Sequence, residues 1–165
     1  MVEIENTDAE GRLILADALS YACEEELPDL LIDFATLTGA ARMAMGPDVP
    51  ALFSNQDKLA RELQDISMSC GDALWHMPLW QPYKELLYSS IADLLNASPS
   101  PQGGAITASL FLEHFIPQGV PWIHLDLMAW NTKNKPARPM GGEAMGLRAV
   151  YQLIKEKCSS DATQG

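Results

Sequence analysis

Cysteine is scarce in this sequence. The 165 residues include three cysteines, Cys23, Cys70 and Cys158, and no two of them form a Cys-x-x-Cys pair. This number and spacing argue against a disulfide framework. We therefore expect reduced thiols, each a small buried or partly buried side chain, in a cytoplasmic protein.

Other absent features narrow the class of protein further. No apolar run approaches the length of a membrane span, Met1 is not followed by a basic and then apolar leader, and there is no internal repeat. Lys and Arg number 11 against 22 Asp and Glu, and the net charge of −11 disfavours nucleic acid and anionic membranes as partners. The sequence also lacks a His-Glu-x-x-His helix and a Gly-x-Ser-x-Gly elbow, which argues against those two hydrolase classes.

The composition that is present suits a single globular domain. Hydrophobic residues make up 47% of the chain and charged residues 20%. Short apolar runs alternate with helical patterns, which predicts an α/β fold with a mostly parallel sheet sandwiched by helices. We expect strands at 30–35, 51–53 and 122–127 and helices at 13–23, 40–45, 105–115 and 143–158. A further, amphipathic helix would carry Leu59, Leu63, Ile66 and Cys70 on its apolar face. Residues 91–96 fit either a strand or a turn, and we expect a frayed tail at 159–165.

The densest group of chemically active side chains lies near the N-terminus, where Asp8, Glu10 and Arg12 fall within five residues. Residues two apart share a side in an extended segment, so two carboxylates serving one site would require an extended chain, with the helix beginning after Glu10. Gly11 would allow the change of direction. A cation in the first helical turn opposes the helix dipole, which hints at function. The group suits a hard divalent metal, although most short acidic pairs are simply solvated.

A second candidate is the loop that follows the expected strand at 30–35. Ligands gather at the carboxyl ends of strands in α/β sheets, and the turn Thr36-Leu37-Thr38-Gly39 could present backbone N–H groups to an oxyanion. The alternative is an ordinary connection between a strand and a helix.

His124 and Asp126 form a third candidate pair. They share one face of the expected strand at 122–127 and could ligate a metal. A structural hydrogen-bonded pair is the favoured interpretation.

Three blocks of this sequence resemble one known family. Asn-Thr-Asp-Ala-Glu-Gly-Arg-Leu, residues 6–13, is similar to the signature octapeptide of the leucine aminopeptidase (cytosol aminopeptidase) family. Ala-Thr-Leu-Thr-Gly-Ala, residues 35–40, resembles the family's substrate-site loop, and Trp-Ile-His-Leu-Asp, residues 122–126, resembles a strand near the end of its catalytic domain. The order and spacing of the blocks also fit, and the similarity extends to about Ile154.

The resemblance implies a two-metal exopeptidase that removes N-terminal amino acids, leucine-like ones preferred, from peptides. Two divalent ions, either manganese or zinc with magnesium also suited, would activate a bridging water and polarise the scissile carbonyl. The octapeptide Asp and Glu of the family are metal ligands, here Asp8 and Glu10, and its Arg, here Arg12, holds the anion or water network at the reacting carbonyl. Family members are homo-hexamers built as two stacked trimers. The implied substrate-binding positions are Thr36, Leu37, whose backbone would meet the substrate amine, and Gly39.

The sequence also departs from the family pattern. The family uses a Lys and two further Asp ligands, and a second, catalytic Lys, all before the octapeptide, where this chain has only residues 1–5. The resemblance therefore implies that residues 1–158 are the C-terminal portion of the catalytic domain, a three-layer α-β-α sandwich whose sheet is incomplete on its N-terminal side. We expect such a chain to be inactive alone and to self-associate through a bared sheet edge. The alternative is a catalytically silent binding or assembly domain that keeps the fold.

Overall fold

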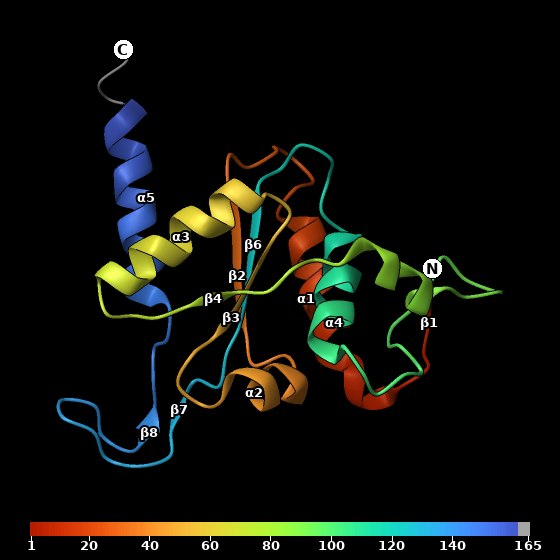
Figure 1. Cartoon of the computed structure of the whole chain (residues 1–165). Coiled ribbons are helices and arrows are strands. Elements are labelled where there is room, and N and C mark those ends of the chain that lie inside the picture. Colours follow the sequence, from red (N-terminus) through yellow and green to blue (C-terminus); the bar gives the residue numbers. More distant parts are fainter. Residues whose placement is uncertain (162–165) are drawn as a thin grey trace.

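The computed structural model describes residues 1–161 of the chain. Secondary structure alternates along most of its length (Figure 1). The elements in chain order are β1 (Val2–Glu3), η1 (Thr7–Ala9), α1 (Glu10–Tyr21), β2 (Leu31–Ala35), α2 (Gly39–Met45), β3 (Ala51–Ser54), α3 (Asp57–Ser69), β4 (Trp75–His76), η2 (Gln81–Leu87), β5 (Leu94–Leu95), α4 (Gly104–Glu113), β6 (Trp122–Asp126), β7 (Trp130–Asn131), β8 (Gly141–Gly142) and α5 (Leu147–Asp161), where η marks a 3-10 helix.

A four-stranded sheet in the order β2-β6-β3-β4 forms the centre of the fold. The β2–β6 and β3–β4 pairs are parallel, whereas β3 and β6 are antiparallel. All three strands expected from the apolar runs are present in this sheet, and a mostly parallel arrangement is confirmed. The register places Ala35, the last residue of β2, opposite Asp126, the last residue of β6. The carboxyl ends of these two strands therefore lie at the same edge of the sheet.

Helices cover both faces of the sheet and make three layers. Helices α3 and α5 pack on one face, where Leu63, Ile123 and Leu153 are fully buried. Helices α1 and α4 pack on the other face with Trp122. Figure 1 shows the two pairs of helices on opposite sides of the strands. The predicted α/β sandwich is therefore correct.

One side of this sandwich is open. Within residues 1–161, strand β2 pairs with β6 alone, so its second edge has no strand partner. Phe34 on β2 is 42% exposed, and Ile14 on α1 is 68% exposed. The continuous apolar run at 30–35 predicts a strand buried on both faces, and the apolar helix at 13–23 predicts one covered on most sides. Both predictions are wrong, because no described element covers this side. The bared sheet edge is present, and self-association through it stays a prediction.

The last helix differs from the prediction at both ends. It begins at Leu147 rather than at residue 143, because Gly146 adopts a positive φ of 78° and the Asp72 carboxylate accepts hydrogen bonds from the N–H groups of Arg148 and Ala149. Its final residues, 159–161, belong to the tail that was expected to be frayed, and residues 162–165 lie outside the described residues. None of the described helices combines the length and the apolar character needed to cross a membrane.

A small parallel ladder fixes the N-terminus beside the middle of the chain. Strand β1 pairs with β5, with Val2 opposite Leu94 and Glu3 opposite Leu95. The ambiguous segment 91–96 is thus partly a strand. This pairing brings residues 94–98 against the octapeptide, although more than 80 residues separate them in sequence.

Candidate active site

The octapeptide is helical rather than extended. Residues Thr7–Ala9 form η1, and Glu10 is the first residue of α1. The Asn6 side chain accepts a hydrogen bond from Asp8 N at 2.9 Å, and Asn6 O accepts one from Ala9 N at 3.2 Å. The expected extended segment was wrong because Asn6 caps a 3-10 turn that runs directly into the helix. Gly11 lies inside the helix and produces no change of direction.

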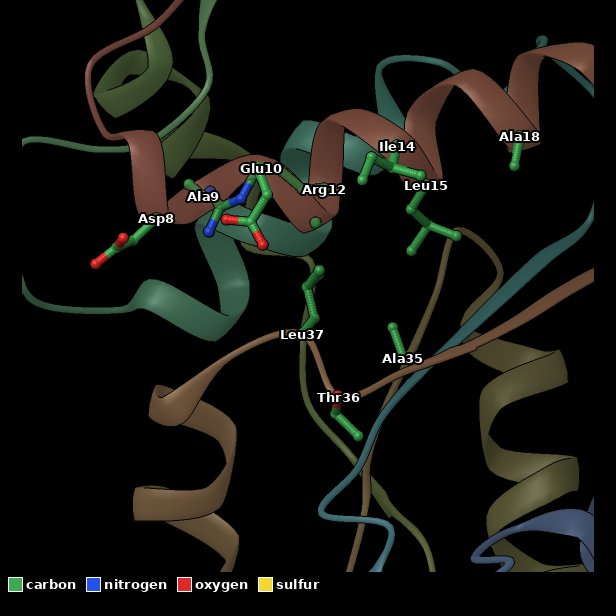
Figure 2. A pocket seen from close by; sticks show the side chains of 11 residues that line it. Asp8, Ala9, Glu10, Arg12, Ile14, Leu15, Ala18, Ala35, Thr36 and Leu37 are labelled. Carbon is green, nitrogen blue, oxygen red and sulfur yellow. The ribbon is translucent and has the colours of Figure 1, made fainter.

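The N-terminal half of α1, with η1 before it, and the end of β2, with the loop after it, line one open cavity of about 430 Å³. Five of the six predicted site residues line it: Asp8, Glu10, Arg12, Thr36 and Leu37. A neighbouring cavity of about 290 Å³ is lined by Gly39, and it shares Asp8, Arg12 and Leu37 with the first. Figure 2 shows the side chains of Glu10 and Arg12 extending from α1 on the side of Leu37, while Asp8 points away from them. The octapeptide and the loop at 36–39, which were separate candidates in the sequence, therefore lie at the same site.

Asp8 and Glu10 both have free carboxylates. Each residue is exposed, and neither carboxylate has a hydrogen-bond or ion-pair partner within residues 1–161. Free carboxylate oxygens are the ligands that hard divalent cations prefer. The described residues contain no cluster of three His, Cys, Asp or Glu side chains able to hold a metal. Asp8 and Glu10 therefore fit a metal ion as part of its shell, and a complete shell requires further donors.

Arg12 is a partly buried cation with spare hydrogen-bonding capacity. Its Nη1 donates to the backbone carbonyl of Asn96 at 2.9 Å, whereas its buried Nε has no partner in the described part of the chain. Burial lowers the pKa of the Arg12 guanidinium from its ordinary value, and the negative charge of Asp126 partly opposes this shift. A desolvated cation with an unused donor can stabilise negative charge that forms in the cavity.

The loop at 36–39 is held by a carboxylate. Asp126 is 2% exposed and accepts hydrogen bonds from Leu37 N at 2.9 Å and Thr38 N at 3.1 Å. The Thr38 hydroxyl also donates to Asp126 at 2.6 Å, and the same hydroxyl caps α2 by accepting from Ala41 N at 3.0 Å. The prediction that this turn offers its N–H groups to an oxyanion is wrong for Leu37 and Thr38, whose donors are already used.

The His124 side chain pairs with a different aspartate from the one considered. His124 Nδ1 lies 2.5 Å from Asp33 Oδ1, and Trp122 Nε1 donates to Asp33 Oδ2 at 2.8 Å. The period-two argument compared positions along one strand, but His124 faces Asp33, its register partner on β2. The predicted hydrogen-bonded pair of His124 with Asp126 is therefore wrong, although each residue has hydrogen bonds to other residues.

Two residues organise the site in roles that the sequence reasoning did not predict. Asp126 could have been found by aligning the carboxyl ends of the expected strands 30–35 and 122–127, since these ends meet when the strands are parallel. Asn96 carried no local signal, because its contacts depend on the pairing of two strands that are each two residues long.

Comparison with known proteins gives a consistent result. The model of the cytosol aminopeptidase family, catalytic domain, matches residues 1–151. A probable cytosol aminopeptidase of Prochlorococcus marinus is 48% identical over 162 residues, covering 97% of this chain and 32% of the relative. A protein of the same description from Desulfovibrio desulfuricans is 47% identical over 156 residues, covering 93% of this chain and 31% of the relative.

Solved structures agree with the sequence comparison. The cytosol aminopeptidase of Coxiella burnetii superposes with a TM-score of 0.89 at 57% identity, covering 94% of this chain and 34% of that protein. The bottromycin maturation enzyme BotP, solved in complex with Mn, gives a TM-score of 0.80 at 39% identity, covering 90% of this chain and 34% of BotP. The chain thus spans about a third of the length of the proteins it matches.

Proposed function

The chain belongs to the cytosol aminopeptidase family, and from this membership we propose that it is a C-terminal portion of the catalytic domain of a two-metal aminopeptidase. The enzyme would remove N-terminal amino acids, leucine-like ones preferred, from peptides in the cytoplasm. Members of the family are peptidases, and this supports an enzymatic role. The observation that carries the proposal is the convergence of Asp8, Glu10, Arg12, Thr36 and Leu37 on one cavity with two unpaired carboxylates.

Asp8 and Glu10 are the proposed metal ligands. Manganese or zinc suits them, and magnesium is also compatible with carboxylate oxygens. The related BotP was solved with Mn, which supports a divalent ion here. When bound, two such ions supply an activated water and a polarised carbonyl. The remaining donors would come from polypeptide outside these 165 residues, because this chain covers only about a third of its relatives.

Arg12 and Leu37 have separate proposed roles. The guanidinium of Arg12, with its unused Nε donor, would hold negative charge at the reacting carbonyl. The N–H of Leu37 is committed to Asp126, so a substrate amine would meet the Leu37 carbonyl. Thr36 and Gly39 line the two adjoining cavities and would limit the space for the substrate side chain.

The test joins this chain to the missing part of a relative. The N-terminal two thirds of the Prochlorococcus protein would be fused before Met1, and hydrolysis of a leucine anilide would be followed with added manganese, beside the 165-residue chain alone. We expect the fusion to be active and sensitive to a chelator, the chain alone to be inactive, and Glu10→Gln to abolish turnover in the fusion. Metal-dependent turnover by the chain alone would contradict the proposal that some of the metal ligands lie outside these 165 residues.

A second candidate function is a catalytically silent binding or assembly domain, because the two carboxylates available within residues 1–161 are too few for a complete metal shell. A fusion that folds, assembles and yet lacks activity with manganese and zinc would favour this alternative. The complete enzyme is also proposed to be a homo-hexamer, as the family resemblance implies, and light scattering of the same fusion tests this assembly.

A further inference from the structure

Asn96 is a fully buried polar residue next to the site. It follows β5 directly and is 0% exposed, although two of its partners, Glu5 and Asn6, are exposed. A buried amide has two donors and an acceptor that must be satisfied. Its partners therefore reveal what the residue holds.

Each polar group of Asn96 contacts the segment that leads into the octapeptide or the octapeptide itself. Its Oδ1 accepts from Glu5 N at 2.9 Å and Asn6 N at 3.2 Å, and its Nδ2 donates to Asn6 O at 2.8 Å and Ala9 O at 3.4 Å. Its backbone N donates to Glu3 O at 2.9 Å, and its backbone carbonyl accepts from Arg12 Nη1 at 2.9 Å. One residue thus contacts the chain on both sides of Asp8 and also the guanidinium of Arg12.

We propose that Asn96 is a positioning residue that holds Asp8, Glu10 and Arg12 in one fixed arrangement. This inference rests on the proposed function, since it concerns the same site. The carboxylates of Asp8 and Glu10 are exposed and have no partner within the described residues, so only the backbone can hold these side chains in place. The amide of Asn96 binds the backbone of Asn6, two residues before Asp8, and the carbonyl of Ala9, between Asp8 and Glu10, and its own carbonyl binds Arg12. Such groups behind metal ligands typically change affinity by about 10- to 100-fold.

The chemistry of the contacts requires an amide at this position. Two N–H groups face Oδ1 and two carbonyl oxygens face Nδ2. The side chain must therefore carry a hydrogen-bond acceptor and a donor on the same terminal carbon. An aspartate at position 96 has the same shape, but its second oxygen would face the carbonyls of Asn6 and Ala9. The Asn96→Asp variant should therefore keep the two accepted bonds and lose the two donated ones.

Asn131 provides a matched control for a purely structural role. It is also buried, at 2% exposure, and its amide donates to Pro139 O and Glu143. These contacts lie in the β7–β8 hairpin, which Figure 1 shows at the opposite end of the molecule from β1. Asn131→Ala should cost stability without altering the site.

The first readout uses the full 165-residue chain and manganese ion alone as the probe. In 15N-labelled protein, Mn²⁺ should broaden the amide signals of Asp8 and Glu10 at a lower concentration than those of other acidic residues. Asn96→Ala should raise the Mn²⁺ concentration needed for half broadening about tenfold, and Asn96→Asp several-fold. Asn131→Ala should leave it unchanged. An unchanged manganese response in folded Asn96→Ala and Asn96→Asp would overturn the inference.

The second readout needs no metal. The Arg12 guanidinium should exchange its protons slowly in the parent chain and in Asn131→Ala, and at least about fivefold faster in Asn96→Ala and Asn96→Asp, because the carbonyl that holds it loses its anchor. Equal exchange in all four proteins would overturn the inference even if manganese binds. If the fusion with the Prochlorococcus N-terminal part, which supplies the remaining donors, binds no manganese at Asp8 and Glu10, the proposed metal site fails, and the Arg12 exchange alone decides whether Asn96 positions these residues.

Discussion

The two segments that form the site are held in place by different chemistry. Asp126, a charged carboxylate, fixes the loop at 36–39, whereas Asn96, a neutral amide, fixes the octapeptide. Hydrogen bonds to a charged group contribute about 1.5–3 kcal/mol each, and bonds between neutral groups contribute about 0.5–1.5 kcal/mol. We therefore expect the loop at 36–39 to be the more rigid half of the site, and the octapeptide with its proposed ligands to open more easily.

Loss of the carboxylate should have the largest effect on stability. Asp126→Ala removes the acceptor for Leu37 N, Thr38 N and the Thr38 hydroxyl, so we expect the free energy of unfolding to fall by about 3 kcal/mol in urea denaturation. Asp65→Ala, at an exposed position of α3, is the control and should change it by less than about 0.5 kcal/mol. A small effect of Asp126→Ala would show that the two halves are held equally weakly.

We expect an intermediate loss of stability when Thr38, which links the loop to α2, is changed. Thr38→Val keeps the shape but removes the hydroxyl that donates to Asp126 and caps Ala41 N, which should cost about 1–2 kcal/mol. Thr36→Val makes the same chemical change at an exposed position two residues earlier. It should leave the unfolding midpoint unchanged, and equal losses in both variants would contradict the assignment of the cap.

The smallest effect on stability is expected at the proposed ligands. Asp8→Asn and Glu10→Gln remove exposed charges that have no partners among the described residues, so unfolding should change by at most about 0.5 kcal/mol, mainly through the helix dipole at Glu10. The manganese-induced broadening should nevertheless disappear in both variants. Calorimetry and the manganese titration on the same samples separate the two effects, and a destabilised Glu10→Gln protein would mean that Glu10 has a structural partner.

The sequence predicted the central sheet better than it predicted the octapeptide. Strands β2, β3 and β6 were found because buried apolar runs report directly on the sheet. The conformation of the octapeptide was wrong, because the capping by Asn6 and the contacts with Asn96 outweigh the preference inferred from the Asp8 and Glu10 spacing. Local patterns cannot report contacts between residues as distant in sequence as Asn6 and Asn96.

Contacts between residues distant in sequence also limited the prediction of the site. The positions of Asp8, Glu10, Arg12, Thr36 and Leu37 around one cavity agree with the family resemblance, which rests on three separate blocks of sequence. Asp126 and Asn96 were not recognised, because their roles follow from the β2–β6 register and the β1–β5 pairing. Exposure of Phe34 and Ile14 was missed for a related reason, since an apolar run does not show whether a further element covers it.

The most direct test of the account is to locate the metal. Crystals of the fusion with the Prochlorococcus N-terminal part would be soaked in manganese chloride, and an anomalous difference map would be calculated at the manganese edge. The account predicts manganese bonded to the carboxylates of both Asp8 and Glu10. Ordered manganese elsewhere in the cavity, with neither carboxylate in contact, would contradict it.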